Sequence, residues 1–316
     1  MAYRIRPRCN VAKEVRSAAL DRIGEARRAL KLPAAQRAEG VHQARKRFKE
    51  LRALLRLVRE PLGDSFQREN RCARDLGRAL AESREATAML ESWDALAKTQ
   101  RSFFAGDALQ QVRQRLGERA EPTAKGGALE ADIEQALSEL RDLAGRASEW
   151  PLEGKGFALL KGGLERSYRE GRRDLARAQR TPDAENLHEW RKRVKDQWYH
   201  SQLLAPCWPQ DFKRRCRHLK RLADDLGDDH DLAMMGQLLA DEPALFGDEA
   251  TRERLAALIE ERRAALQAAA FASGQRLYAE SPKALVKRRP TGGLPAPSVI
   301  ERQCFAASRA RLPQKY

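Results

Sequence analysis

The chain has 316 residues, of which 61 are Lys or Arg and 45 are Asp or Glu, so its formal net charge is +16 at pH 7. Hydrophobic residues make up 42% of the chain, which excludes a disordered polybasic tail. No stretch approaches the ~18 consecutive apolar residues of a membrane-spanning helix, and the start, Met-Ala-Tyr-Arg-Ile-Arg, lacks the apolar run of a signal peptide. These features predict a folded cytoplasmic protein with no membrane partner.

The five cysteines are odd in number and widely spread, and they contain no Cys-x-x-Cys pair. This pattern is typical of reduced, mostly buried thiols and not of a disulfide framework or a zinc site. The excess of positive charge fits either an anionic partner or solubility alone, and composition does not choose between them.

The residue composition favours helices almost throughout the sequence. Ala, Leu, Arg, Glu and Lys dominate, and no window shows the alternation of a strand. Pro and Gly divide the chain into long segments, which predicts roughly eight to ten helices joined by short loops, and hence antiparallel bundles. One helix start is marked by Thr181-Pro182-Asp183, where Thr181 is expected to cap the helix and Pro182 to occupy its first position. The predicted fold class is all-α.

The first predicted helix carries a cation among its core positions. Arg22 falls on the same stripe as Val15, Ala19 and Ile23. A cation in such a place is either buried with a partner or lines a wet cavity. Arg22 is therefore a candidate site residue, with a surface position as the alternative.

The second predicted helix, at residues 41–59, separates an apolar stripe from a basic face. The adjoining basic face carries one sign of charge over four turns, and Arg47 and Glu50 are expected on the side that faces water. A solvated helix usually pairs opposite charges four residues apart. Because stacked like charges are unfavourable, the basic face predicts an anionic ligand. Its residues are His42, Arg45, Lys46, Lys49, Arg52 and Arg56.

The basic motif recurs 146 residues later, where Val41–Glu50 aligns without gaps on Leu187–Asp196. The sequence thus predicts an internal duplication, with units at 1–148 and 149–290 and a basic, Pro-rich tail at 291–316. The second copy of the motif and the neighbouring helices supply the remaining candidates. They are His188, Arg191, Lys192 and Lys195 in the motif, Arg172 before it, Arg71, Arg74 and Arg78 in the first copy, and Arg217, Lys220 and Arg221 in the second.

The chemistry of these side chains favours a phosphate polymer. Arg binds phosphate through two parallel hydrogen bonds, and Lys acts as a point charge. Recognition of bases would need aromatic platforms among the cations, yet aromatic residues are only 6% of the chain. The prediction is a binder of inorganic polyphosphate or a similar polyanion. The alternatives are a nucleic-acid-associated basic protein and a helical scaffold with a protein partner.

The acidic segment Asp224–Asp231 is open to two interpretations. Its carboxylates and His230 could bind a metal ion, or Gly227 ends one helix and Asp228 or Asp229 caps the next, while some carboxylates pair with nearby arginines. We favour the second interpretation and assign no metal or cofactor. The sequence has no nucleophile elbow, Gly-rich phosphate loop or paired carboxylates beside a motif, so we expect a binding protein and no enzyme.

The duplicated pattern His-x-x-Arg-Lys-x-x-Lys, with Leu-Gly-Asp-Asp-His-Asp-Leu at 226–232, resembles the CHAD family, the conserved-histidine α-helical domain. The resemblance spans roughly residues 3–290. It implies two pseudo-symmetric antiparallel helical bundles around a basic central groove or pore, polyphosphate binding, and association with polyphosphate granules. His230 matches the family's second histidine position, where the first copy has Arg84. No strand-rich segment suggests the triphosphate-processing barrel to which some relatives are fused.

Overall fold

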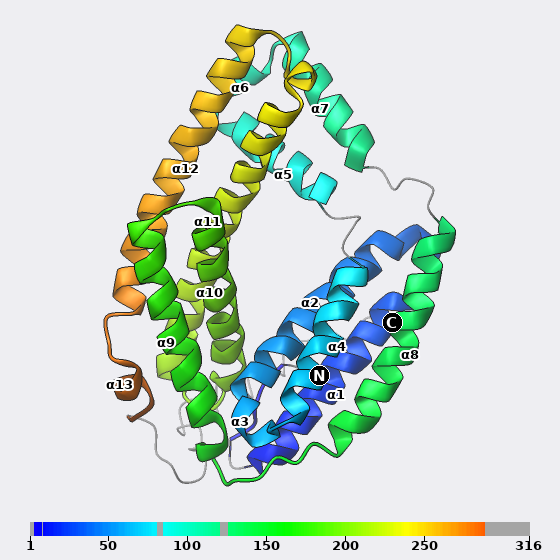
Figure 1. Cartoon of the computed structure of the whole chain (residues 1–316), viewed down its shortest axis with the longest axis vertical. Helices are drawn as coiled ribbons and strands as arrows, with labels where there is room; N and C mark the ends of the chain where they lie inside the picture. Colours follow the sequence, from blue (N-terminus) through cyan, green and yellow to red (C-terminus); the bar gives the residue numbers. More distant parts are fainter. Residues whose placement is uncertain (1–2, 8, 81–84, 121–125, 288–316) are drawn as a thin grey trace, which may run out of the picture.

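The computed structural model describes residues 3–7, 9–80, 85–120 and 126–287, and all regular secondary structure in these residues is helical, as predicted (Figure 1). It contains ten α-helices of 14 residues or more, besides shorter pieces. No helix in these residues is long and apolar enough to cross a membrane. The tail at 291–316 and Arg84 lie outside the described residues.

The first bundle consists of four long helices that lie side by side (Figure 1). They are α1 (Val11–Leu30), α2 (Arg37–Leu57), α4 (Ser65–Ala79) and α8 (Gly126–Ser148), with the single turn α3 (Arg59–Leu62) between α2 and α4 and the 3-10 turn η1 (Ala34–Gln36) before α2. Their apolar stripes face inward, and Ile23, Phe48 and Leu140 are almost completely buried.

The second bundle is built from the later part of the chain. It contains α9 (Ala158–Arg180), α10 (Ala184–Leu204), α11 (Pro209–Asp241), α12 (Glu249–Leu277) and the short α13 (Pro282–Lys287). The two bundles meet where α2 contacts α9 and α10, and one continuous hydrophobic core extends through both. The two helices that carry the repeated motif, α2 and α10, are each 21 residues long.

Three helices of the first predicted unit pack on the second bundle. The helices α5 (Glu85–Thr99), α6 (Arg101–Phe104) and α7 (Asp107–Ala120) lie at the upper end of Figure 1, against α11 and the 3-10 turn η2 (Pro243–Phe246). A separate apolar core joins them there, with Trp93, Phe104, Met235 and Phe246 among its members. The predicted boundary near residue 148 coincides with the connection from α8 to α9, but 85–120 belongs in space to the second bundle.

Besides α2, which spans Arg37–Leu57 where the helix was expected at residues 41–59, two helix boundaries differ from the sequence predictions. The carboxylate of Asp183, and not Thr181, caps α10 by accepting a hydrogen bond of 2.7 Å from the backbone N–H of Asn186, so Pro182 lies outside the helix. The expected break at Gly227 is also wrong, because α11 continues through it. Gly227 is buried against Arg191, and Asp229 pairs with Arg263 of α12 at 3.3 Å, so neither residue serves as a cap.

Candidate functional site

A pocket of about 450 Å³, here called the basic pocket, lies between α2, α4 and α10. Helical spacing brings residues three and four apart onto one face, so the polar face of each motif helix reaches it. Ten of the eighteen predicted cations line the basic pocket: Arg45, Lys49, Arg52 and Arg56 of α2, Arg74 and Arg78 of α4, and His188, Arg191, Lys192 and Lys195 of α10.

The two carboxylates that line the basic pocket are already engaged. Glu189 accepts a hydrogen bond of 2.5 Å from Lys192, and Asp196 accepts one of 2.7 Å from Arg56 and a longer one of 3.4 Å from Arg193. The pocket therefore keeps a large excess of positive charge. A partly enclosed site of this kind attracts anions with several charges.

Lys195 illustrates the electrostatic cost of this arrangement. Its burial, followed by the charges of Arg191 and Lys49, lowers the pKa of its amine to about 7, although Asp231 and Asp224 oppose the change. Arg52 responds in the same direction, since burial and then the neighbouring Arg56 lower its pKa to about 10. The cations of the basic pocket thus destabilise one another in the ligand-free protein.

Two histidine rings lie together beside these cations. The ring centroids of His188 and His230 are 4.5 Å apart, and the Nδ1 atom of each is buried without a hydrogen-bond partner among the described residues. Burial, then the neighbouring His230 and the cations Lys192 and Arg191, lower the pKa of His188 to about 4. Burial and Arg191 also lower the pKa of His230. Both shifts favour the neutral form of the ring.

Arg22 forms part of a buried ion-pair network on the far side of α2. It is 3% exposed and donates hydrogen bonds to Glu50 at 2.9 Å and to Glu25 at 2.8 Å, and Arg47 also pairs with Glu50 at 2.8 Å. The expectation that Glu50 faces water is wrong, because Arg22 projects from α1 into the interface and needs a counter-charge there. Arg22 and Arg217 line a separate pocket of about 700 Å³ and not the basic pocket.

The six other predicted cations lie outside the basic pocket. Arg172 donates a hydrogen bond of 3.3 Å to the backbone oxygen of Glu280, and Lys220 pairs with Asp224 at 2.6 Å. The remaining four are the partly buried His42 and the exposed Lys46, Arg71 and Arg221.

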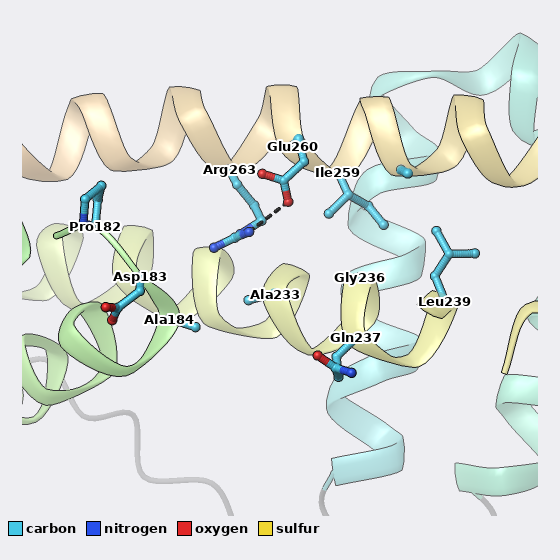
Figure 2. A pocket seen from close by; sticks show the side chains of 11 residues that line it. Pro182, Asp183, Ala184, Ala233, Gly236, Gln237, Leu239, Ile259, Glu260 and Arg263 are labelled. Carbon is cyan, nitrogen blue, oxygen red and sulfur yellow. Dashed lines mark hydrogen bonds and ion pairs between the residues drawn. The ribbon is translucent and has the colours of Figure 1, made fainter. Parts of the chain in front are cut away.

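A third pocket, of about 460 Å³, lies between the start of α10 and the facing stretches of α11 and α12 (Figure 2). Its polar groups are used within the fold. Arg263 binds Glu260 at 2.8 Å and also Asp229, while Asp183 caps α10. None of the predicted cations lines this pocket, so it is not the candidate site.

Some lining residues of the basic pocket were missed by sequence reasoning. Arg193 lines it while it pairs with Glu170 and Asp196, and Tyr199 and Phe48 form part of its wall. Arg193 repeats Arg47 at the 146-residue offset, but no periodic signal separates a lining arginine from a solvent-facing one. The acidic segment 224–231 includes Asp229, which pairs with an arginine as expected. In the part of the chain that the structure describes, no three His, Cys, Asp or Glu side chains are placed to hold a metal ion.

Comparisons with known proteins identify the fold and the family. The crystal structure of the CHAD domain from the plant Ricinus communis has a TM-score of 0.61 to this chain at 18% identity, and the match covers 88% of this chain and 95% of that one. No curated protein matches the chain. The family model of the CHAD domain matches residues 16–240, which is most of the sequence. The protein therefore belongs to the CHAD family.

Proposed function

We propose that the protein binds inorganic polyphosphate, or a polyanion of similar charge density, in the basic pocket. The observation that carries the proposal is the convergence of nine predicted Lys and Arg residues, together with His188, from α2, α4 and α10 on one pocket of about 450 Å³. Its two carboxylates are already paired. Membership of the CHAD family supports the same conclusion.

The mechanism is multivalent electrostatics. The guanidinium groups of Arg45, Arg191 and Arg78 can each bind two phosphate oxygens, whereas Lys49 and Lys195 supply compact charges. A bound chain replaces the repulsion among these cations with attraction and releases its own counterions. The affinity therefore depends strongly on salt.

The walls of the basic pocket favour polyphosphate over single-stranded nucleic acid. Its Phe and Tyr residues, Phe48 and Tyr199, are only 2% and 4% exposed, so their rings offer no open face on which a base could stack. RNA or DNA remains the second candidate, because its phosphates would satisfy the same cations. The direct comparison is competition between long-chain polyphosphate and single-stranded RNA at one salt concentration, in which we expect polyphosphate to displace the RNA.

The first test is a titration with long-chain polyphosphate at several salt concentrations. We expect tight binding at low salt that weakens steeply, with a slope of log K against log salt of about −0.7 per phosphate neutralised, by analogy with single-stranded nucleic acids. Micromolar or weaker affinity at low salt, or an equal preference for RNA, contradicts the proposal.

The second test reverses two charges inside the basic pocket. The double variant Lys49→Glu/Lys195→Glu places carboxylates on both motif helices, so we expect binding to be abolished while circular dichroism shows native helical content. The matched control is Lys13→Glu/Lys98→Glu, which makes the same change in net charge at exposed positions outside the three pockets. Undiminished binding in the first variant excludes the basic pocket as the site.

We also propose that the protein is a binder without catalytic activity and that it associates with polyphosphate granules in cells that form them. No phosphate release is expected when the protein is incubated with polyphosphate. A fluorescent fusion should colocalise with granules, and the double variant Lys49→Glu/Lys195→Glu should not. Release of phosphate contradicts the absence of catalytic activity. Equal granule staining by both fusions contradicts association through the basic pocket.

A further inference from the structure

Lys195 lies where three helices converge on the basic pocket. Its own helix α10 places His188 and Arg191 beside it, and α2 contributes Lys49 from the opposite wall. From α11, the charges of Asp224 and Asp231 act on Lys195, and Lys195 in turn acts on His230, while α4 adds Arg74 and Arg78 to the lining. The positive neighbours outnumber the negative ones, and Lys195 is partly buried.

Loss of a proton by Lys195 relieves part of this repulsion near neutral pH. The arginines keep their protons at any physiological pH, and the lowered pKa values of both histidines favour their neutral forms. The amine of Lys195, with a pKa of about 7, can lose a proton in this pH range. A phosphate chain threaded among these cations reverses the balance of charge around that amine.

We propose that the basic pocket takes up a proton when polyphosphate binds, and that Lys195 is the group that accepts it. The inference rests on the proposed function, which it deepens by making the affinity dependent on pH. The proton comes from solvent or buffer and forms the third N–H bond of the ammonium group, which then faces the phosphate oxygens.

The sign of the effect follows from linkage. The bound polyphosphate chain raises the pKa of Lys195 above its value in the free protein. Below pH 7 the amine is already protonated in the free protein, so its charge contributes fully to the binding free energy. As the pH rises above 7, protonating the amine costs free energy and the binding weakens. For one proton and a free pKa of about 7, affinity should fall about fifteen-fold between pH 7.0 and pH 8.5.

The test is isothermal titration calorimetry with long-chain polyphosphate at pH 8.0, in several phosphate-free buffers that differ in ionisation enthalpy. A long chain is required because its few terminal phosphates, which titrate near neutral pH, then contribute little. The slope of observed enthalpy against buffer ionisation enthalpy gives the number of protons exchanged. We expect uptake of about 0.9 proton per binding pocket, since a group with a pKa of about 7 is mostly neutral at this pH.

Three variants test whether Lys195 is the group that takes up the proton. Lys195→Arg keeps its charge at pH 8, so it should bind without proton uptake and lose the pH dependence. Lys195→Met should bind more weakly than the parent at pH 6.5 and also without uptake. Lys13→Arg is the matched control, because Lys13 is exposed and lies outside the basic pocket, so this variant should keep the proton uptake of the parent protein.

The outcomes separate the two proposals. Binding whose enthalpy does not depend on the buffer overturns the proton uptake but leaves the proposed function standing. Uptake that persists in Lys195→Arg overturns the assignment to Lys195. Absence of any binding heat, confirmed by a filter assay, overturns the proposed function and this inference together.

Discussion

Arg22 and Glu50 show that a buried charged side chain requires a side chain of opposite charge beside it. Arg22 lies on the core stripe of α1, and a guanidinium cannot be buried there without a counter-charge, so Glu50 turns toward it from α2. Sequence periodicity identified Arg22 as anomalous, but it assigned Glu50 to the water side. The error has a simple origin, because helical phase locates a face and does not say what packs against it.

This network predicts a clear effect on stability. Glu50→Gln removes the shared anion of Arg22 and Arg47 and leaves Glu25 as their remaining partner, so the free energy of unfolding should fall by about 3 kcal/mol. The control is Asp94→Asn, which breaks the more exposed pair with Arg113 and should cost less than about 1 kcal/mol. Urea denaturation measures both, and equal losses in the two variants contradict the assigned role of Glu50.

At the scale of elements, the motif helices were predicted well because their information is local. The 3.6-residue period that places Arg45, Lys49, Arg52 and Arg56 on one face holds in any fold that forms the helix. The interpretation of Gly227 failed for the complementary reason. A glycine followed by aspartates looks like a helix end, yet here it leaves room for the guanidinium of Arg191 on α10.

Gly227→Ala tests that role. The added methyl would lie 2.9 Å from Nη2 of Arg191, the far end of a flexible side chain, so Arg191 should move and polyphosphate affinity should fall. Stability should be unchanged or should rise by up to about 1 kcal/mol, since Ala favours a helix over Gly. The control Gly117→Ala on α7 meets nothing within 4 Å and should leave binding unchanged. Calorimetry and thermal unfolding provide the two measurements, and unaltered affinity in Gly227→Ala contradicts the proposed contact.

At the scale of the whole molecule, the two bundles depend on a close backbone approach. Gly163 of α9 faces Leu57 at the end of α2, and a Cβ atom at 163 would fall on the carbonyl group of Leu57. The chain reverses from α8 into α9 close to the predicted boundary, but the bundles share one core and are not independent units. The internal duplication itself stays a prediction, supported by the matched lengths of α2 and α10.

Gly163→Ala should therefore weaken the packing of α9 against α2, which connects the two bundles. Because the clash is with backbone, it can be relieved only by moving α9 away from α2, and we expect a loss of about 2–3 kcal/mol in the free energy of unfolding. Its neighbour provides a matched control, since Gly162→Ala meets only the flexible carboxylate of Glu60 at 3.4 Å. Chemical denaturation that shows equal stability for both variants contradicts this account.

The sequence by itself determined the all-α class, the motif helices and ten of the residues that line the basic pocket, while the ligand chemistry that it favours stays a prediction. All of these follow from periodicity and side-chain type, which are local properties. Only the tertiary structure decided that Arg22 and Arg217 line a different pocket, that α11 is unbroken, and that α5–α7 pack on the second bundle. It also showed that Lys195 is partly buried among cations. These facts depend on which helix faces pack together when the helices are far apart in the sequence. A short-range sequence pattern does not contain that information.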